Sequence, residues 1–295
     1  MLSFSPLTPQ AAPMAAPYLL ASRDRICDFT IGALLMWRDF NSTEYAIWQN
    51  SLFLKVRYQG QTLFTLPLGG DKPAAFQALI KYAASEKLPL ILSPVTESGL
   101  RFLETLHTPM RAEPRRDWFD YLYDAAGLTV FKGKKYHGQR NHVNRFQKSW
   151  PGWSFAPAEA GDIPGIAAFL KVFFEQRPAS DSIGAEEQRK TAELFRDPCF
   201  FGMLTGVLRV GPEIAAVAAG EISGDTLFVH IEKADTRFSG VYPMMAQAFA
   251  GAYATGAVTY VNREEDDGIP GLRAAKLAYH PVRLIEKYLV YWGEG

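Results

Sequence analysis

The densest group of chemically reactive side chains lies between residues 260 and 281. The segment reads Tyr260-Val-Asn-Arg-Glu-Glu-Asp-Asp-Gly-Ile-Pro-Gly-Leu-Arg-Ala-Ala-Lys-Leu-Ala-Tyr-His-Pro281 and mixes charges of both signs with Asn, Tyr and His. It starts where an apolar run (residues 257–261) stops and a helix is expected to begin. Surface ion pairs contribute only about 0–1 kcal/mol each, so stability alone does not explain this density. Because strand-to-helix junctions often form ligand sites, the segment is predicted to be one.

The second feature is a basic segment that contains no acidic residue between positions 125 and 158. Plotted as a helix from Lys134, it has an apolar face of Tyr136, Val143, Phe146 and Trp150. The opposite face is polar and consists of His137, Asn141, Asn144, Arg145 and Lys148. Such a face is commonly just solvated surface, but Arg and Lys are also the usual partners of phosphate groups. Both interpretations stay open; the second predicts that Lys135, Arg140, Asn141 and Asn144 bind substrate.

Composition limits the class of protein. The 295 residues favour two domains, and 48% apolar with 21% charged residues is ordinary for a globular protein. Lys plus Arg equals Asp plus Glu at 31 each, so global charge does not direct the chain to nucleic acid or membrane. Cys27 and Cys199 are too few for a metal cluster, and a cytoplasmic location is predicted. No apolar run is long enough to span a bilayer, so no integral membrane segment is expected.

The order of predicted elements is α+β. Strands are expected over residues 45–48, 52–58, 61–67, 88–92, 118–123, 153–155, 201–210, 213–222, 226–234, 257–261 and 282–290. Helices are expected over residues 73–86, 97–107, 163–175, 185–195 and 242–254, besides the basic segment and a helix starting near residue 269. The first half looks like a degraded version of the second. Two domains are therefore predicted, residues 1–149 ending in the basic helix and residues 150–295 carrying the site.

Four blocks within residues 132–281 carry a family resemblance. They are Lys132-Gly-Lys-Lys-Tyr-His-Gly-Gln-Arg-Asn-His-Val-Asn-Arg-Phe146, His230-Ile-Glu-Lys-Ala-Asp235, Asn262-Arg-Glu-Glu-Asp266 and Gly271-Leu-Arg-Ala-Ala-Lys-Leu-Ala-Tyr-His-Pro281. Together they resemble a bacterial domain family similar to the C-terminal catalytic domain of phosphatidylglycerol lysyltransferases. The resemblance implies two tandem GNAT-like acyltransferase domains, each a mixed, mostly antiparallel sheet flanked by helices.

The resemblance also implies a reaction, the transfer of an aminoacyl group from aminoacyl-tRNA to an acceptor. The tRNA 3′ end would be a partner, and a small molecule or a peptide the acceptor. No tightly bound cofactor and no metal site are expected. A coenzyme A-dependent N-acetyltransferase is the alternative enzyme. Against it, the loop expected to hold the pyrophosphate reads Arg237-Phe-Ser-Gly-Val-Tyr242, followed by Pro243, which lacks an N–H donor. A non-catalytic binder of RNA or phosphate ligands is the third hypothesis.

Aminoacyl transfer needs a proton acceptor and positive charge near the developing oxyanion. Because strand side chains alternate, His230 and Glu232 are expected to share one face, with Lys233 on the other. Glu232 and Lys233 are the predicted catalytic residues; Glu232 would bind the donor's α-amino group or deprotonate the acceptor. Arg263, Arg273 and Lys276 are, with Lys233, candidates for oxyanion or phosphate contacts, while Glu264 and Asp266 would bind a cationic group. Asn262 and Tyr279, from the same blocks, complete the predicted substrate-binding set.

Overall fold

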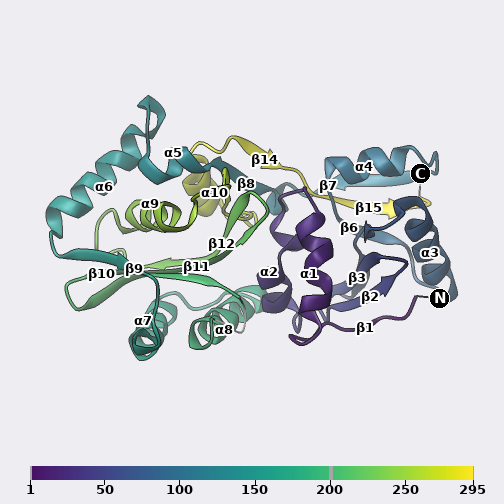
Figure 1. The fold of residues 1–295 in the computed structure, drawn as a ribbon, viewed down its shortest axis with the longest axis horizontal. Helices are drawn as coiled ribbons and strands as arrows, with labels where there is room; N and C mark the ends of the chain where they lie inside the picture. Colours follow the sequence, from purple (N-terminus) through teal and green to yellow (C-terminus); the bar gives the residue numbers. More distant parts are fainter. Residues whose placement is uncertain (1, 199–201, 295) are drawn as a thin grey trace. The chain divides into compact units, whose positions relative to one another are not determined.

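The computed structural model describes residues 2–198 and 202–294 (Figure 1). The chain forms two compact units. The first contains the chain up to Asp120, Glu265–Ile269 and the chain from Leu284 onward; the second contains Tyr121–Glu264 and Pro270–Arg283. Cys199 and the predicted start of a strand at Phe201 lie outside the described residues. Among the described helices, none combines the length and the apolar character that crossing a membrane requires.

The first unit is built on a mixed sheet with the strand order β1-β2-β3-β4-β6-β15-β7. Its strands are β1 (Ser5–Pro6), β2 (Glu44–Trp48), β3 (Ser51–Tyr58), β4 (Gln61–Phe64), β5 (Leu68–Gly69, paired with β3), β6 (Ile91–Val95), β7 (Met110–Pro114) and β15 (Tyr288–Trp292). Its helices are α1 (Ala12–Ala21), α2 (Ile31–Trp37), α3 (Lys72–Ser85) and α4 (Glu97–Glu104). Helix α3 begins where the Asp71 side chain accepts from the Ala74 N–H, and it buries Phe76 and Leu79 in the core.

The second unit has a sheet with the order β14-β8-β13-β12-β11-β10-β9. Its strands are β8 (Asp120–Asp124), β9 (Trp153–Ala156), β10 (Leu204–Val210), β11 (Glu213–Ser223), β12 (Thr226–Ala234), β13 (Tyr260–Asn262) and β14 (Arg283–Ile285). Its helices are α5 (Ala125–Val130), α6 (His137–Ser149), α7 (Ile163–Gln176), α8 (Ser182–Arg196), α9 (Val241–Tyr253) and α10 (Pro270–Leu277). Helices α7 and α8 cover one face of this sheet, and α9 with α5 and α6 covers the other (Figure 1). The predicted α+β fold class, with mixed, mostly antiparallel sheets flanked by helices, is confirmed.

The two sheets share one order of elements. An antiparallel meander (β2–β4 or β10–β12) is followed by a helix, a strand parallel to the last meander strand, a second helix and an outer strand, β7 or β14. In each sheet, the strand next to the outer strand does not come from the neighbouring part of the chain: the two sheets exchange β8 and β15. In the chain β8 follows β7 but inserts between β13 and β14, whereas β15 follows β14 but inserts between β6 and β7.

This exchange corrects two expectations. The units do not divide into residues 1–149 and 150–295, because β8 and α6 belong to the second unit and β15 returns to the first. The single final strand expected over residues 282–290 is two strands, β14 and β15, and these join different sheets. Helices α1, α2 and α5 and strand β7 were not predicted from the sequence. Pro17 inside α1 weakens its helical signal.

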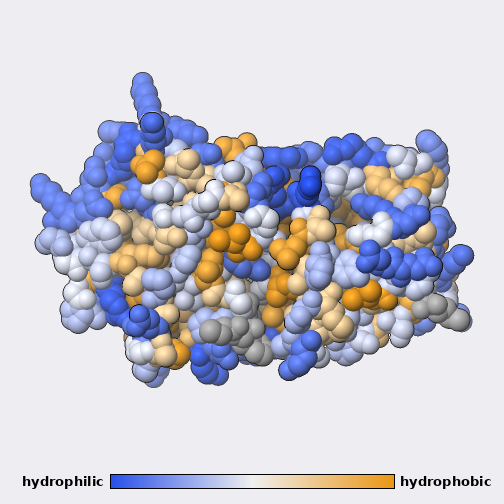
Figure 2. Space-filling view, viewed as in Figure 1, coloured by the Kyte–Doolittle hydropathy of each residue, from blue (hydrophilic) through white to orange (hydrophobic). Residues whose placement is uncertain are grey.

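The basic helix forms as predicted. In α6 and the turn before it, Tyr136, Val143 and Phe146 are buried, whereas Asn141, Asn144 and Lys148 are exposed. The surface over α6 is accordingly hydrophilic, and the surface over the adjacent α9 is paler to orange (Figure 2). Amphipathicity alone therefore defines which side of α6 packs against α9.

Candidate active site

The site forms where two parallel strands of the second unit separate. Strands β12 and β13 pair over three residues only, ending with Phe228 opposite Asn262. Strand β13 stops there, while β12 continues to Ala234. Beyond Phe228, β12 therefore has no strand neighbour on this side among the described residues, and residues that follow β13 can approach it.

An ion pair between Glu232 and Arg263 joins β12 to the residue that follows β13. Nη2 of Arg263 donates to both carboxylate oxygens of Glu232, at 3.1 and 3.0 Å. The side chains are only 9% and 14% exposed. The guanidinium lies 4.6 Å from the centre of the Tyr279 ring, so it is also held by a cation–π contact. Nη1 of Arg263 is buried and has no hydrogen-bond partner among the residues that the structure describes.

Tyrosines and Lys276 surround this pair. The Tyr123 hydroxyl donates to the Lys276 carbonyl at 2.8 Å, and Nζ of Lys276 donates to the Arg263 carbonyl at 2.6 Å. Nζ of Lys276 also lies 5.8 Å from the centre of the Tyr121 ring. Burial raises the pKa of Tyr279 to about 12, and it raises the pKa values of Tyr123 and Tyr242 as well. These phenols therefore stay protonated at neutral pH and can act as hydrogen-bond donors.

Glu232 has the properties of a proton acceptor. Burial raises the pKa of its carboxyl above the usual range, although the Arg263 guanidinium opposes the shift. A more basic carboxylate beside a fixed cation can take a proton from a nucleophile or bind an ammonium group.

His230 does not share the face of Glu232, which corrects the expectation from strand alternation. Ala219 of β11 pairs with Ile231, but the next residue, Gly220, pairs with Val229, so His230 is the extra residue of a β-bulge. Gly220 permits the close approach, because a Cβ there would lie 2.1 Å from the Phe228 carbonyl oxygen. The bulge reverses the alternation of side chains along the rest of β12.

His230 instead forms a second, separate cluster. Its ring nitrogens lie 2.6 Å from Glu264 and 2.9 Å from Glu221, and its ring stacks on Phe228. Burial alone would lower the pKa of His230, but the two carboxylates raise it to about 10. The imidazole is therefore charged at neutral pH and holds the turn after β13 in place, which makes it unsuitable as a general base.

This cluster predicts a pH-dependent stability. Because the folded-state pKa of His230 lies above its unfolded value, its contribution is complete below about pH 6.5 and is lost as pH rises through about 10. Replacing His230 by Gln should lower the free energy of unfolding by roughly 2–4 kcal/mol at pH 6, and the difference should shrink toward pH 10. Urea denaturation at several pH values measures it. His142→Gln, at an exposed position of α6, is the control; a His230 difference that does not vary with pH would contradict the prediction.

The remaining predicted site residues of β12 and of the charged segment divide between several places. Lys233 lies on the opposite face of β12 from Glu232, where its Nζ binds Glu187 of α8. Glu264 contacts His230, and the buried Asn262 accepts from the Glu264 N–H through Oδ1 at 2.6 Å. Asn262 thus shapes a turn in which Glu264 has a φ of 56°.

Asp266 belongs to the first unit. Its fully buried carboxylate pairs with Arg116 at 3.0 Å and accepts from the Gly268 N–H at 3.0 Å. Binding of a cationic substrate group by Asp266 stays a prediction. Arg273 is half-buried on α10, three residues before Lys276, and its role stays a prediction.

The α6 candidates have different surroundings. Nη1 of Arg140 donates to the carbonyls of Phe131 and Gly133 just after α5, where a cation complements the end of a helix. The exposed Lys135 accepts from His280 through its carbonyl, Asn141 bonds His137 at 3.1 Å, and Asn144 is exposed. Substrate binding by these four residues is untested and stays a prediction.

Sequence reasoning missed the tyrosines of β8. Tyr121 and Tyr123 alternate on one face of a predicted strand, which was the available signal. Their distance in sequence from Glu232 and Arg263 concealed their place in the site. Tyr242 was read only as an obstacle to a pyrophosphate.

The first unit contains a buried cluster with metal-ligand atoms. Ligand atoms of Cys27, Asp28 and Asp120 lie within 4.8 Å of one another. Nζ of Lys287 lies among them, 2.6 Å from Asp28, 2.8 Å from Asp120 and 3.4 Å from the Cys27 sulfur, with Glu265 at 3.5 Å. An ammonium group thus takes the position that a cation would need. Burial raises the pKa of Cys27 well above its usual value, so its thiol is not activated.

The chain matches a known protein family over most of its length. The family model described as "Phosphatidylglycerol lysyltransferase, C-terminal" matches residues 21–291. No curated protein is similar enough to match. A conserved protein of unknown function from Bacteroides thetaiotaomicron has 30% identity and a TM-score of 0.92, with 99% of this chain and 100% of that one covered.

Two solved structures of named proteins are more distant. L-PGS from Bacillus licheniformis has 14% identity and a TM-score of 0.68, covering 98% of this chain and 93% of that one. FemX has 12% identity and a TM-score of 0.66, covering 98% and 97%. At such identities the likeness shows a shared fold, which is GNAT-like.

Proposed function

Because the chain belongs to the family of phosphatidylglycerol lysyltransferase C-terminal domains, we propose that it moves an aminoacyl group from aminoacyl-tRNA to an acceptor. The acceptor is a small molecule or a peptide that carries a nucleophilic amine or hydroxyl. One observation carries the proposal. A buried Glu232–Arg263 pair joins β12 to the residue after β13, and Nη1 of Arg263 has no partner among the described residues.

The proposed reaction assigns one task to each group. The acceptor nitrogen or oxygen attacks the ester carbonyl carbon of the donor and gives its proton to Glu232. Nη1 of Arg263 stabilises the oxyanion, assisted by the protonated Tyr279. The bond between the carbonyl carbon and the ribose oxygen then breaks, and the ribose oxygen takes the proton from Glu232. Lys276 positions Arg263 through its hydrogen bond to the Arg263 carbonyl.

The first turn of α9 argues against acetyl-coenzyme A as donor. A pyrophosphate would need free N–H groups at the start of this helix. There, a Cβ on Gly240 would lie 2.3 Å from the His142 carbonyl oxygen, so the main chain of α6 packs directly against that turn. Pro243 contributes no N–H, and the Arg237 side chain is bound to Asp235 at 2.7 Å.

The third hypothesis, a non-catalytic binder of RNA or phosphate ligands, would account for the basic surface of α6. It offers no reason for a buried carboxylate with a raised pKa beside an arginine. The proposed setting is the cytoplasm, where aminoacyl-tRNA is available, and the proposed chemistry needs no tightly bound cofactor.

The decisive experiment incubates the protein with tRNAs charged with labelled amino acids and a mixture of amine and hydroxyl acceptors. Transfer of label from tRNA to an acceptor, in excess of spontaneous hydrolysis, is the expected result. A parallel reaction contains labelled acetyl-coenzyme A instead. Acetyl transfer there, without aminoacyl transfer, would overturn the proposal in favour of the acetyltransferase.

A further inference from the structure

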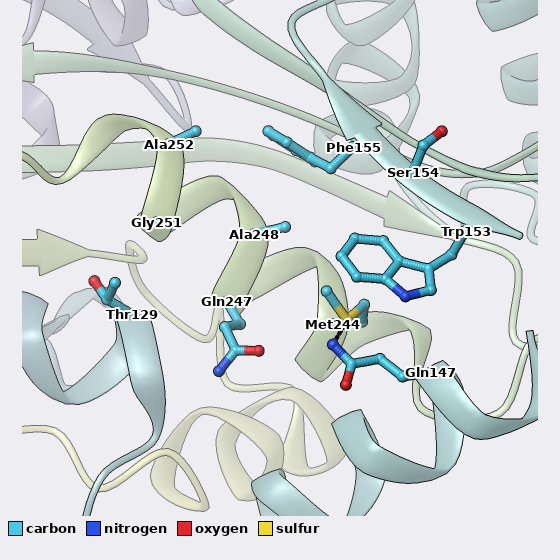
Figure 3. A pocket seen from close by; sticks show the side chains of 10 residues that line it. All are labelled: Thr129, Gln147, Trp153, Ser154, Phe155, Met244, Gln247, Ala248, Gly251 and Ala252. Carbon is cyan, nitrogen blue, oxygen red and sulfur yellow. Dashed lines mark hydrogen bonds between the residues drawn. The ribbon is translucent and has the colours of Figure 1, made fainter. Parts of the chain in front are cut away.

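The second unit has an open groove away from the Glu232–Arg263 pair (Figure 3). Its volume of about 750 Å³ lies within the roughly 300–1,000 Å³ of ligand pockets. Residues of α5, α6, β9 and α9 form it: Thr129, Gln147, Trp153, Ser154, Phe155, Met244, Gln247, Ala248, Gly251 and Ala252. Neither Glu232 nor Arg263 lines it, so the reaction described above does not use it.

The floor of the groove is one face of α9. Met244, Gln247, Ala248, Gly251 and Ala252 follow the helical spacing that places side chains in one stripe. Because Ala248, Gly251 and Ala252 are small, their side chains do not fill the groove. Gly251 and Ala252 are exposed, so no other described element covers this part of α9.

The walls combine aromatic rings with carboxamides. Trp153 and Phe155 of the edge strand β9 alternate so that both rings face the groove, and both are half-buried (Figure 3). Within the described part of the chain, the side-chain amide of Gln147 donates one weak hydrogen bond, to the Met244 sulfur at 3.9 Å. An indole face offers stacking, and a carboxamide offers a donor together with an acceptor.

The charge beside the groove is positive. Gln147 lies on α6, where the neighbouring Asn144 and Lys148 are exposed, while Arg140, one turn before Asn144, is bound to the carbonyls of Phe131 and Gly133. No acidic residue occurs between positions 125 and 158. A polyanion could therefore run along α6 while a planar group enters the groove next to it.

We infer that this groove binds an unpaired nucleobase of a single-stranded RNA segment, with the flanking phosphates on α6. Proteins that bind single strands combine these two features, aromatic stacking and a basic track. The inference rests on the proposed function in that the RNA would be the single-stranded part of the aminoacyl-tRNA donor. Trp153 stacks on the base, Gln147 and Gln247 bond its edge, and Lys148 contacts a phosphate.

The test uses a fluorescein-labelled single-stranded hexaribonucleotide and a matched probe with the same phosphates but abasic riboses. Fluorescence anisotropy at low salt measures the dissociation constants. Gly251→Phe fills the groove; a Cβ there meets only the Thr129 methyl, at 3.9 Å, so the variant should fold. Trp153→Ala removes the stacking surface. Matched controls are Phe174→Ala and Lys171→Gln on α7, on the opposite face of the sheet.

The parent should bind the base-bearing probe at least tenfold more tightly than the abasic probe. Gly251→Phe and Trp153→Ala should each remove most of this preference and leave abasic binding unchanged. Lys148→Gln should weaken both probes and reduce the dependence of binding on salt. Equal binding of the two probes by the parent, or full base preference in Gly251→Phe, would overturn the inference. So would an extended peptide that binds β9 when RNA does not.

The probe carries no aminoacyl group, so its binding is independent of catalysis. Base-dependent binding in the groove without transfer from any charged tRNA would remove the proposed function and leave this inference intact. Aminoacyl transfer whose rate is unaffected by Gly251→Phe would remove this inference and leave the proposed function intact.

Discussion

Replacing Glu232 by Gln should reduce the rate of aminoacyl transfer by about 10²–10⁴-fold, the usual contribution of a positioned acid or base. Gln has the shape of Glu but cannot accept a proton at neutral pH. Its single carbonyl oxygen can still accept one of the two hydrogen bonds that Nη2 of Arg263 now donates at 3.1 and 3.0 Å, whereas its NH2 group cannot accept the other. The loss should therefore appear in kcat more than in KM.

Single-turnover assays with one charged tRNA separate this loss from weaker donor binding. Arg263→Lys is the companion variant: it keeps a positive charge but loses the second guanidinium nitrogen, and should lose about 10²-fold or more in rate. Glu175→Gln on the exposed surface of α7 is the matched control and should retain parental activity. Activity of Glu232→Gln within threefold of the parent would show that solvent or the donor's own amine takes the proton.

Replacing Lys287 by Met should lower the free energy of unfolding by about 3–5 kcal/mol, because it leaves buried carboxylates without their cation. Lys287 is 2% exposed in its side chain, and Asp120 is fully buried. Burial alone would lower the pKa of Lys287, but Asp120 and Asp28 raise it well above the usual value. The ammonium is therefore charged throughout the range in which the protein is handled.

The loss should depend on pH. Burial raises the pKa of Asp120 to about 7, so at pH 5 its carboxyl is largely protonated and needs the ammonium less. The Lys287→Met variant should accordingly be closer to the parent at pH 5 than at pH 8. Urea denaturation followed by circular dichroism measures both values. Adding Asp120→Asn should restore part of the lost stability at pH 8, and Lys81→Met at an exposed position of α3 should change little.

A Lys287→Met loss that is as large at pH 5 as at pH 8 would show that the aliphatic part of the lysine, and not its charge, stabilises the cluster. The location of the cluster explains why its effect should be large. Asp120 begins β8, Glu265 follows the turn after β13, and Lys287 lies between β14 and β15. Asp120 and Glu265 lie directly at points where the chain passes from one unit to the other, and Lys287 follows another such point, between Arg283 and Leu284.

The periodicity of apolar residues was sufficient to predict most individual helices and strands. Strand β12 has the predicted bounds, residues 226–234, and α6 buries the apolar face that its spacing indicates. The order of the predicted elements led to the α+β fold class, which the structure confirms. The family blocks led to the family, which the match over residues 21–291 bears out. Their place at a strand end also led to Glu232, Arg263 and Lys276, three groups that the structure brings together.

The alternation of side chains predicted the wrong face where one extra residue forms a β-bulge. The bulge at His230 reverses the faces of β12, so His230 turns away from Glu232 and binds Glu264 instead. A bulge depends on the backbone of the neighbouring strand, here on Gly220, and not on the type of the bulged residue. The alternating pattern of β12 itself carries no sign of it.

The spacing of residue types was enough to predict most of the elements, the family and the segment with the reactive groups, because these depend on residues close together in the chain. Which strand completes which sheet, and which carboxylate meets which cation, followed only from how distant segments fold together. Strands β8 and β15 both combine Tyr with Leu, so their composition does not indicate which sheet each one joins. Asp266 and Glu264 are two residues apart, yet one pairs with Arg116 and the other with His230, because the chain changes unit between them.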